Sequence, residues 1–226
     1  MRMSRSERIH AQLSGIWVST TRIKALGPME FELFYDYHCP FVYRASLLLA
    51  NVAAERKPKV GWRYFSLTQV NSREPGWTVW DASSTERVRG RLAFKSAEAA
   101  RRQDRFDAFH SALLHARHID RLDIDEVNVV EQVAVDSGLD IDRFRRDLND
   151  ATILEALARD HQHAVAAYGV FGTPTFVFSN GASAYIRLAD APNGAEALRV
   201  FDSLVAVAAD EPGILEIKRP VKPSPD

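Results

Sequence analysis

The segment around the only cysteine of the chain restricts the fold more than any other part of the sequence. Phe31, Leu33 and Tyr35 alternate with acidic or aromatic neighbours, which predicts a half-buried strand. After Cys39 the apolar residues recur at helical spacing, and Pro40 stands at the first helical position, where an N–H group would have been unpaired anyway. The sequence therefore predicts a strand, a sharp turn and a helix, with Cys39 at the turn.

Cys39 and His38 are the candidate catalytic residues of this turn. The free N–H groups and the dipole at a helix N-terminus favour a thiolate over a thiol. His38, when protonated, acts in the same direction, whereas the apolar side chains of Phe41 and Val42 oppose the thiolate through desolvation. The competing interpretation is that a lone cysteine is simply a small buried apolar residue.

A second segment begins a strand with a proline. Pro174 directly precedes the β-branched and aromatic run 175–178, and proline in a sheet is confined to a strand start, an edge or a bulge. The Asn180-Gly181 pair then predicts a hairpin into a further strand. For the Thr173–Pro174 bond, the residues alone leave the trans form as the default.

Both segments carry motifs of a known family. The motifs are Asp36-x-x-Cys39-Pro40-x-x-Tyr43 and, far downstream, Gly169-Val170-x-Gly172-Thr173-Pro174-Thr175-Phe176. In this order, with a helical stretch between them, they resemble the DsbA-like branch of the thioredoxin superfamily over roughly residues 29–209. That branch includes cytoplasmic FrnE-type oxidoreductases, mycothiol-dependent reductases and, more distantly, kappa-class glutathione transferases and 2-hydroxychromene-2-carboxylate isomerases.

The resemblance implies roles for individual residues. Cys39 would be the attacking cysteine. Pro174 would be cis, with the backbone of Thr173 offered to a substrate across from the thiol. The substrate site would then be lined by Pro40, Phe41, Val42, Thr173 and Pro174.

The chain departs from the redox members of this branch at one position. Those members have Cys-x-x-Cys, whereas Val42 stands where the resolving cysteine would be. Because the chain has one cysteine, exchange would run through mixed disulfides resolved by a second, external thiol. Glutathione, mycothiol or a protein thiol are the candidate co-substrates, and no bound cofactor is expected. The isomerase and transferase relatives usually carry serine at the position of Cys39, so the sequence fits neither group fully.

The order of the remaining elements predicts an α/β, thioredoxin-like fold, βαβ then ββα, with an all-helical insertion between the halves. A strand at 60–67 would complete the first unit as a parallel neighbour. We expect an N-terminal extension at 1–28, a thioredoxin-like domain at 29–82 and 165–210, a helical insertion at 83–164 and an irregular C-terminal tail at 211–226.

Two regions have roles that the sequence leaves open. The loop 68–81 contains Trp77 and Trp80, which either line a substrate cleft or cap the core, with equal weight. In the extension, we expect a short helix over residues 6–13. A role of this extension in forming a homodimer stays open, although no sequence pattern supports it.

Composition narrows the classes of function. The formal net charge of −1 predicts no general attraction to nucleic acid or to membranes. A single cysteine excludes a disulfide framework and fits a reducing, cytoplasmic location. His110, His115 and His118 are close in sequence, but no Cys-x-x-Cys or His-Glu-x-x-His pattern accompanies them, so we expect no metal site.

Three functions are compatible with these features. The favoured one is a DsbA-like thiol-dependent oxidoreductase that uses Cys39 through mixed disulfides. The first alternative is a thiol-cofactor-dependent transferase or isomerase of the kappa-class or hydroxychromene-carboxylate isomerase type. The second alternative is a non-catalytic thioredoxin-like binding module that has lost redox function with its second cysteine.

Overall fold

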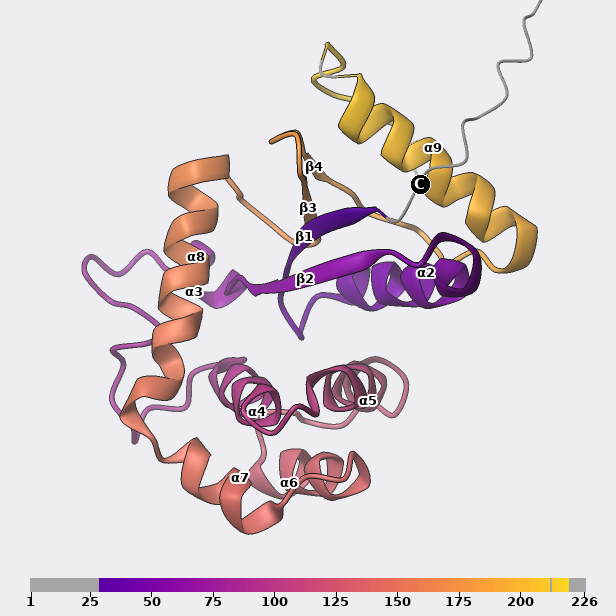
Figure 1. Cartoon of the computed structure of the whole chain (residues 1–226). Helices are drawn as coiled ribbons and strands as arrows, with labels where there is room; N and C mark the ends of the chain where they lie inside the picture. The colour runs from indigo at the N-terminus through magenta and orange to yellow at the C-terminus, as the bar shows by residue number, and fades with distance from the viewer. Residues whose placement is uncertain (1–28, 212, 220–226) are drawn as a thin grey trace, which may run out of the picture.

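Strand β1 (Glu30–Tyr35) lies inside a four-stranded sheet of order β2-β1-β3-β4 (Figure 1). The computed structural model describes residues 29–211 and 213–219, so the expected extension 1–28 and its helix lie outside the described residues. β2 (Lys59–Tyr64) runs parallel to β1. β3 (Thr175–Phe178) is antiparallel to β1, and β4 (Ser183–Tyr185) is antiparallel to β3.

Helices connect and cover this sheet. Helix α2 (Pro40–Arg56) joins β1 to β2, which confirms the predicted βαβ unit. Between β2 and β3 the chain forms α3 (Leu67–Asn71), α4 (Arg91–Arg101), α5 (Phe106–His118), α6 (Val127–Asp136), α7 (Ile141–Leu148), a 3-10 turn η1 (Ala151–Leu154) and α8 (Glu155–Tyr168). Helix α9 (Gly194–Asp210) follows β4 and packs on α2. The α/β thioredoxin-like fold predicted from the sequence is therefore correct.

Two boundaries follow from local hydrogen bonds. The second strand is shorter than expected, because Ser66 caps helix α3 by accepting a hydrogen bond at 3.1 Å from the N–H of Gln69. The predicted hairpin forms between β3 and β4. Within it, Gly181 has φ +85°, a conformation that glycine adopts without strain, and Phe178 N donates to Ala182 O at 2.9 Å.

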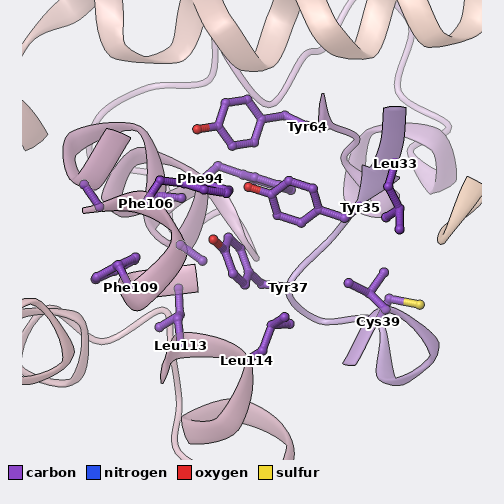
Figure 2. Packing of buried hydrophobic residues seen from close by; sticks show 14 of the residues in the cluster. Leu33, Tyr35, Tyr37, Cys39, Tyr64, Phe94, Phe106, Phe109, Leu113 and Leu114 are labelled. Atoms are coloured by element: carbon purple, nitrogen blue, oxygen red, sulfur yellow. The ribbon is translucent and has the colours of Figure 1, made fainter. Parts of the chain in front are cut away.

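The two faces of the sheet bury different sets of side chains. Phe31, Leu33 and Tyr35 point into a large apolar core that continues into α2, α9 and the helices α4–α7. Figure 2 shows Tyr35 and Tyr37 of this core beside Phe94 and Phe106, with the Cys39 sulfur directed away from the rings. Phe34 faces the opposite side, where α8 covers a smaller cluster of Phe34, Phe65, Ala164, Val170 and Val177.

The helices α4–α7 lie together on one side of the sheet, below it in the view of Figure 1. Helix α8 runs across the boundary expected between residues 164 and 165, and it packs on β2 through a hydrogen bond of 3.0 Å from Tyr64 N to Asp160 Oδ2. The division of the chain into a thioredoxin-like domain and an insertion at these residues stays a prediction. Residues 211 and 213–219 contain neither helix nor strand.

Candidate active site

Cys39 occupies the junction between β1 and α2. It is the N-cap residue of α2, with extended φ and ψ of −83° and 114°, and Pro40 follows in the first turn. Its side chain makes no capping hydrogen bond, so the sulfur is available for other contacts. The local structure is thus the strand, turn and helix that the apolar spacing predicts, with the thiol beside the positive end of a 17-residue helix.

The two sequence motifs meet at the sulfur. Cys39 Sγ lies 3.2 Å from the carbonyl oxygen of Thr173, to which the thiol donates a hydrogen bond. The Thr173–Pro174 peptide bond is cis. Cys39 is 4% exposed, so the resting thiol is nearly covered by its neighbours. Three residues before Pro174, Phe171 is 67% exposed and packs against Tyr185, with ring centroids 5.0 Å apart.

The carboxylate of Asp36 holds the start of the cysteine turn through two hydrogen bonds. Its carboxylate is 2% exposed and accepts hydrogen bonds at 2.8 Å from the N–H groups of His38 and Leu67. Burial raises the pKa of this carboxyl, while the two N–H donors oppose that rise. Asp36 therefore joins the cysteine turn to the start of α3, a contact that the sequence motif contained but did not explain.

His38 is held by the helical part of the chain. Its Nε2–H donates a hydrogen bond at 3.0 Å to Asp125 Oδ2, in the loop before α6. The other ring nitrogen, Nδ1, is buried and has no hydrogen-bond partner within the described residues. A carboxylate that orients one ring nitrogen and leaves the other free is the arrangement that makes a histidine a proton acceptor.

Tyr37, between these two residues, is anchored twice more. Its hydroxyl and Nδ1 of His110 are joined by a hydrogen bond of 3.0 Å, and its carbonyl accepts one at 2.9 Å from Nε2–H of His118. His118 stacks on Tyr43 of α2, with centroids 5.4 Å apart. Burial lowers the pKa of both histidines, that of His110 to about 3, so they contribute as neutral rings.

The other predicted substrate residues lie around the thiol at different depths. Pro40 is exposed and Phe41 is half-buried, whereas Val42 is fully buried in the first turn of α2. Thr173 is buried, and its hydroxyl has no hydrogen-bond partner among the described residues. The structure therefore brings all seven predicted site residues together, with Val42 packed into the core rather than facing the surface.

A cavity of about 530 Å³ opens beside this turn on the side of α3. Its lining includes Asp36, His38, Thr68, Trp77 and Arg89. Cys39 is not part of its lining. Trp77 thus lines a cleft, whereas Trp80 packs toward His161, with ring centroids 5.5 Å apart. Both tryptophans are also partly buried against the core, so Trp77 has both of the roles that the sequence left open.

Two further observations concern metals and membranes. Across residues 29–211 and 213–219, no three His, Cys, Asp or Glu side chains are grouped closely enough to hold a metal ion. In the same residues, no helix has both the length and the apolar character needed to span a bilayer.

Four anchoring residues were missed by sequence reasoning as parts of the site. They are Tyr37, His110, His118 and Asp125. His110 and His118 were considered only as metal ligands, and Asp125 carries no sequence signal that distinguishes it from other surface acids.

The sequence of the chain is similar to one known domain family and to a mycobacterial protein. The sequence profile of the DSBA-like thioredoxin domain matches residues 30–206. The uncharacterized protein Rv2286c of Mycobacterium tuberculosis is 26% identical over 197 residues, which cover 85% of this chain and 83% of that protein.

Solved structures agree on the fold. The probable DsbA oxidoreductase SCO1869 from Streptomyces coelicolor has a TM-score of 0.58 at 19% identity, covering 87% of this chain and 94% of that one. Pseudomonas aeruginosa DsbA has a TM-score of 0.52 at 16% identity, covering 82% of this chain and 88% of that one. The cytosolic disulfide reductase DsbM from Pseudomonas aeruginosa with GSH has a TM-score of 0.50 at 17% identity, covering 67% of this chain and 87% of that one. Because the profile match extends over more than half of the chain, this protein belongs to the DSBA-like thioredoxin domain family.

Proposed function

We propose that the protein is a monothiol oxidoreductase that exchanges thiols and disulfides through Cys39. The observation that carries the proposal is the contact of 3.2 Å between Cys39 Sγ and Thr173 O, at the N-terminus of α2 and next to Pro174. A helix N-terminus supports a thiolate. A substrate that hydrogen-bonds to the Thr173 backbone would displace this contact and free the Cys39 sulfur for attack.

The reaction has two exchange steps. In the first, the Cys39 thiolate attacks one sulfur of a disulfide R–S–S–R′, forms the mixed disulfide Cys39–S–S–R and releases R′–S⁻. In the second, an external thiolate R″–S⁻ attacks the R sulfur, forms R–S–S–R″ and restores the Cys39 thiolate. Since Val42 replaces the resolving cysteine, the second thiol must come from outside the chain.

We propose His38, the neighbour of Cys39 in the chain, as the proton acceptor of this scheme. Asp125 holds its Nε2–H, which leaves Nδ1 free to accept. We propose glutathione or mycothiol as the low-molecular-weight thiol and a cytoplasmic location. A cytosolic disulfide reductase with GSH among the solved structures of the same fold supports this choice.

The test is the formation of a mixed disulfide. Incubation with glutathione disulfide, followed by intact-mass measurement, is expected to give one adduct on the wild type and none on Cys39→Ser. Reduced glutathione should then remove the adduct and regenerate the thiol. A wild type that forms no adduct with any disulfide would refute the oxidoreductase and would favour the non-catalytic binding module.

The cavity beside His38 favours a second candidate, a transferase or isomerase with a bound thiol cofactor. Its volume of about 530 Å³ is within the range of small-molecule sites. In that function glutathione would supply the sulfur and Cys39 would be dispensable. A Cys39→Ser variant that keeps full turnover of an organic substrate would favour the transferase or isomerase over the oxidoreductase.

A further inference from the structure

Two arginines lie against the ring of Phe41, which is two residues from the thiol. The Cζ atom of Arg187 lies 4.1 Å from the ring centroid and that of Arg44 lies 5.3 Å from it. Both guanidinium groups are thus held at the ring by cation–π attraction. Arg44, on α2, also donates a hydrogen bond at 3.0 Å to the carbonyl of Leu188, which ties α2 to the segment that carries Arg187.

The segment of Arg187 is also fixed to the proline turn. The backbone N–H of Ile186 donates to the carbonyl of Pro174 at 3.1 Å. The carbonyl of the preceding residue, Thr173, is the one that accepts the hydrogen bond from Cys39. The same turn therefore contacts both the thiol and the backbone of the segment that carries Arg187.

Neither guanidinium is neutralised by the part of the chain that the structure describes. Among residues 29–211 and 213–219, no carboxylate oxygen lies within 4.0 Å, the limit for an ion pair, of a guanidinium nitrogen of Arg44 or Arg187. Elsewhere, by contrast, Arg56, Arg102 and Arg145 each pair with an Asp or Glu at 2.5 to 2.7 Å. Guanidinium groups present planar sets of donors that match a carboxylate, and such charge-assisted hydrogen bonds are the strong ones.

We propose that Arg44 and Arg187 bind a carboxylate of the thiol substrate. Cys39 would then exchange preferentially with disulfides and thiols that carry a carboxylate, which favours glutathione over mycothiol, whose cysteine carboxyl is in an amide bond. This inference rests on the proposed function of Cys39 and names its substrate class. The contact orients the disulfide and takes no part in bond making, because the only bonds that change are those of the exchange steps.

The test compares three symmetrical disulfides of different charge. They are glutathione disulfide, which carries carboxylates, bis(2-hydroxyethyl) disulfide, which is neutral, and cystamine, which is cationic. The rate of Cys39 adduct formation is followed by intact mass, and each rate is divided by that of the same disulfide with free 2-mercaptoethanol. We expect the normalised rate to be highest for the anionic disulfide, lower for the neutral one and lowest for the cationic one. These differences in rate should shrink as ionic strength rises.

Variants then assign the preference to the two arginines. Arg187→Gln and Arg44→Gln should each lower the ratio of the normalised rate with glutathione disulfide to that with the neutral disulfide by roughly two- to fivefold, the size of one lost surface ionic contact. Arg187→Lys keeps the positive charge, so the rate with glutathione disulfide should depend on ionic strength as it does in the wild type. The matched control is Arg199→Gln on α9, an exposed arginine paired with Glu196, which should behave as the wild type.

The outcomes separate this inference from the function on which it rests. If both glutamine variants react with glutathione disulfide as fast as the wild type, or lose rate equally with the neutral disulfide, the arginines do not bind the carboxylate. In either case the neutral disulfide still reports whether Cys39 exchanges at all. A wild type that reacts with none of the three disulfides would overturn both the function and the inference.

Discussion

Nε2–H of His38 donates a hydrogen bond at 3.0 Å to Asp125 Oδ2, and each of these side chains is 8% exposed. The second carboxylate oxygen, Oδ1, accepts at 2.8 Å from the N–H of Gly90, at the start of α4. Gly90 has φ +82°, and a Cβ there would lie 3.3 Å from His38 Cδ2. One buried carboxylate thus joins the cysteine turn to two segments of the helical region.

Removal of this carboxylate should destabilise the protein and impair the site together. In Asp125→Ala, the ring Nε2–H of His38 and the backbone N–H of Gly90 both lose their acceptor, and a buried unsatisfied donor costs about 1–3 kcal/mol. We expect a lower free energy of unfolding in urea and a slower formation of the Cys39 adduct. Asp125→Asn keeps an acceptor oxygen and should lose less of both.

The matched control for this prediction is Glu155→Ala. Glu155 is exposed and pairs with Arg159 one helical turn away, at 3.6 Å, and such surface pairs contribute about 0–1 kcal/mol. An Asp125→Ala variant as stable and as reactive as the Glu155→Ala control would show that the His38–Asp125 contact has no role in holding the turn.

A second cysteine can be placed at position 42, where the resemblance to the redox members of the family implies a resolving cysteine. Val42 is fully buried in the first turn of α2, three residues after Cys39, and cysteine is a smaller apolar residue that fits there. In Val42→Cys, the second thiol would attack the mixed disulfide from within the chain, which replaces an external reaction by an intramolecular one.

The expected result is a protein that forms an internal disulfide and reduces insulin with less external thiol. Titration of free thiols after mild oxidation should find none in Val42→Cys and one in the wild type. The control, Val42→Ser, has no second sulfur and should keep the wild-type thiol count. Two free thiols in oxidised Val42→Cys would mean that the buried position is closed to exchange.

The cysteine turn could be predicted because its signals are local. Phe31, Leu33 and Tyr35 alternate along β1, and Pro40 marks the start of α2, so each element follows from a few neighbouring residues. That Cys39 meets Thr173 came from the family resemblance, because no local pattern joins residues 134 positions apart.

The anchors of the turn could not be predicted for the same physical reason. His38 and Asp125 are 87 residues apart, and Tyr37 and His110 are 73 apart. Their pairing depends on how α4–α6 pack beside the sheet. A single sequence gives the apolar face of each helix, but it does not give the rotation and height that decide which polar residue reaches the turn.

Acid should destabilise the fold through buried histidines. Burial lowers the pKa of His110 to about 3 and that of His161 to about 4, whereas an unfolded histidine takes up its proton near pH 6.5. As pH falls below 6.5, the unfolded state binds protons that the folded state does not. The free energy of unfolding therefore decreases with falling pH, by up to about 1.4 kcal/mol per pH unit for each histidine, until pH reaches the folded pKa.

His110→Gln tests this linkage, because glutamine can hydrogen-bond Tyr37 but does not titrate. Urea unfolding between about pH 7 and pH 4.5 should show a shallower loss of stability in this variant than in the wild type. His115→Gln is the control, since the side chain of His115 is half exposed and hydrogen-bonds the exposed Asp120. Equal slopes in all three proteins would contradict a neutral, buried His110 in the folded state.

The continuity of the core leads to a prediction about unfolding. The large cluster of buried side chains runs from Leu33 of β1 through Phe94 to Phe109 and Phe144 without a break between sheet and helices. Phe109 is fully buried, with its ring centroid 6.0 Å from that of Phe144. Phe109→Ala should therefore cost about 3–5 kcal/mol and lower the stability of the sheet as well as that of α5.

Hydrogen exchange read by mass spectrometry distinguishes one cooperative unit from two. In Phe109→Ala, peptides from β1 and from α5 should lose protection by the same free energy, because global unfolding exposes both. Val127→Ala, a truncation at an exposed position of α6, should change protection by no more than about 0.5 kcal/mol. If β1 kept its wild-type protection in Phe109→Ala while α5 lost it, the helices would form a separately unfolding unit. The single core would then be divided in solution, and the cysteine turn would lose its anchors before the sheet unfolds.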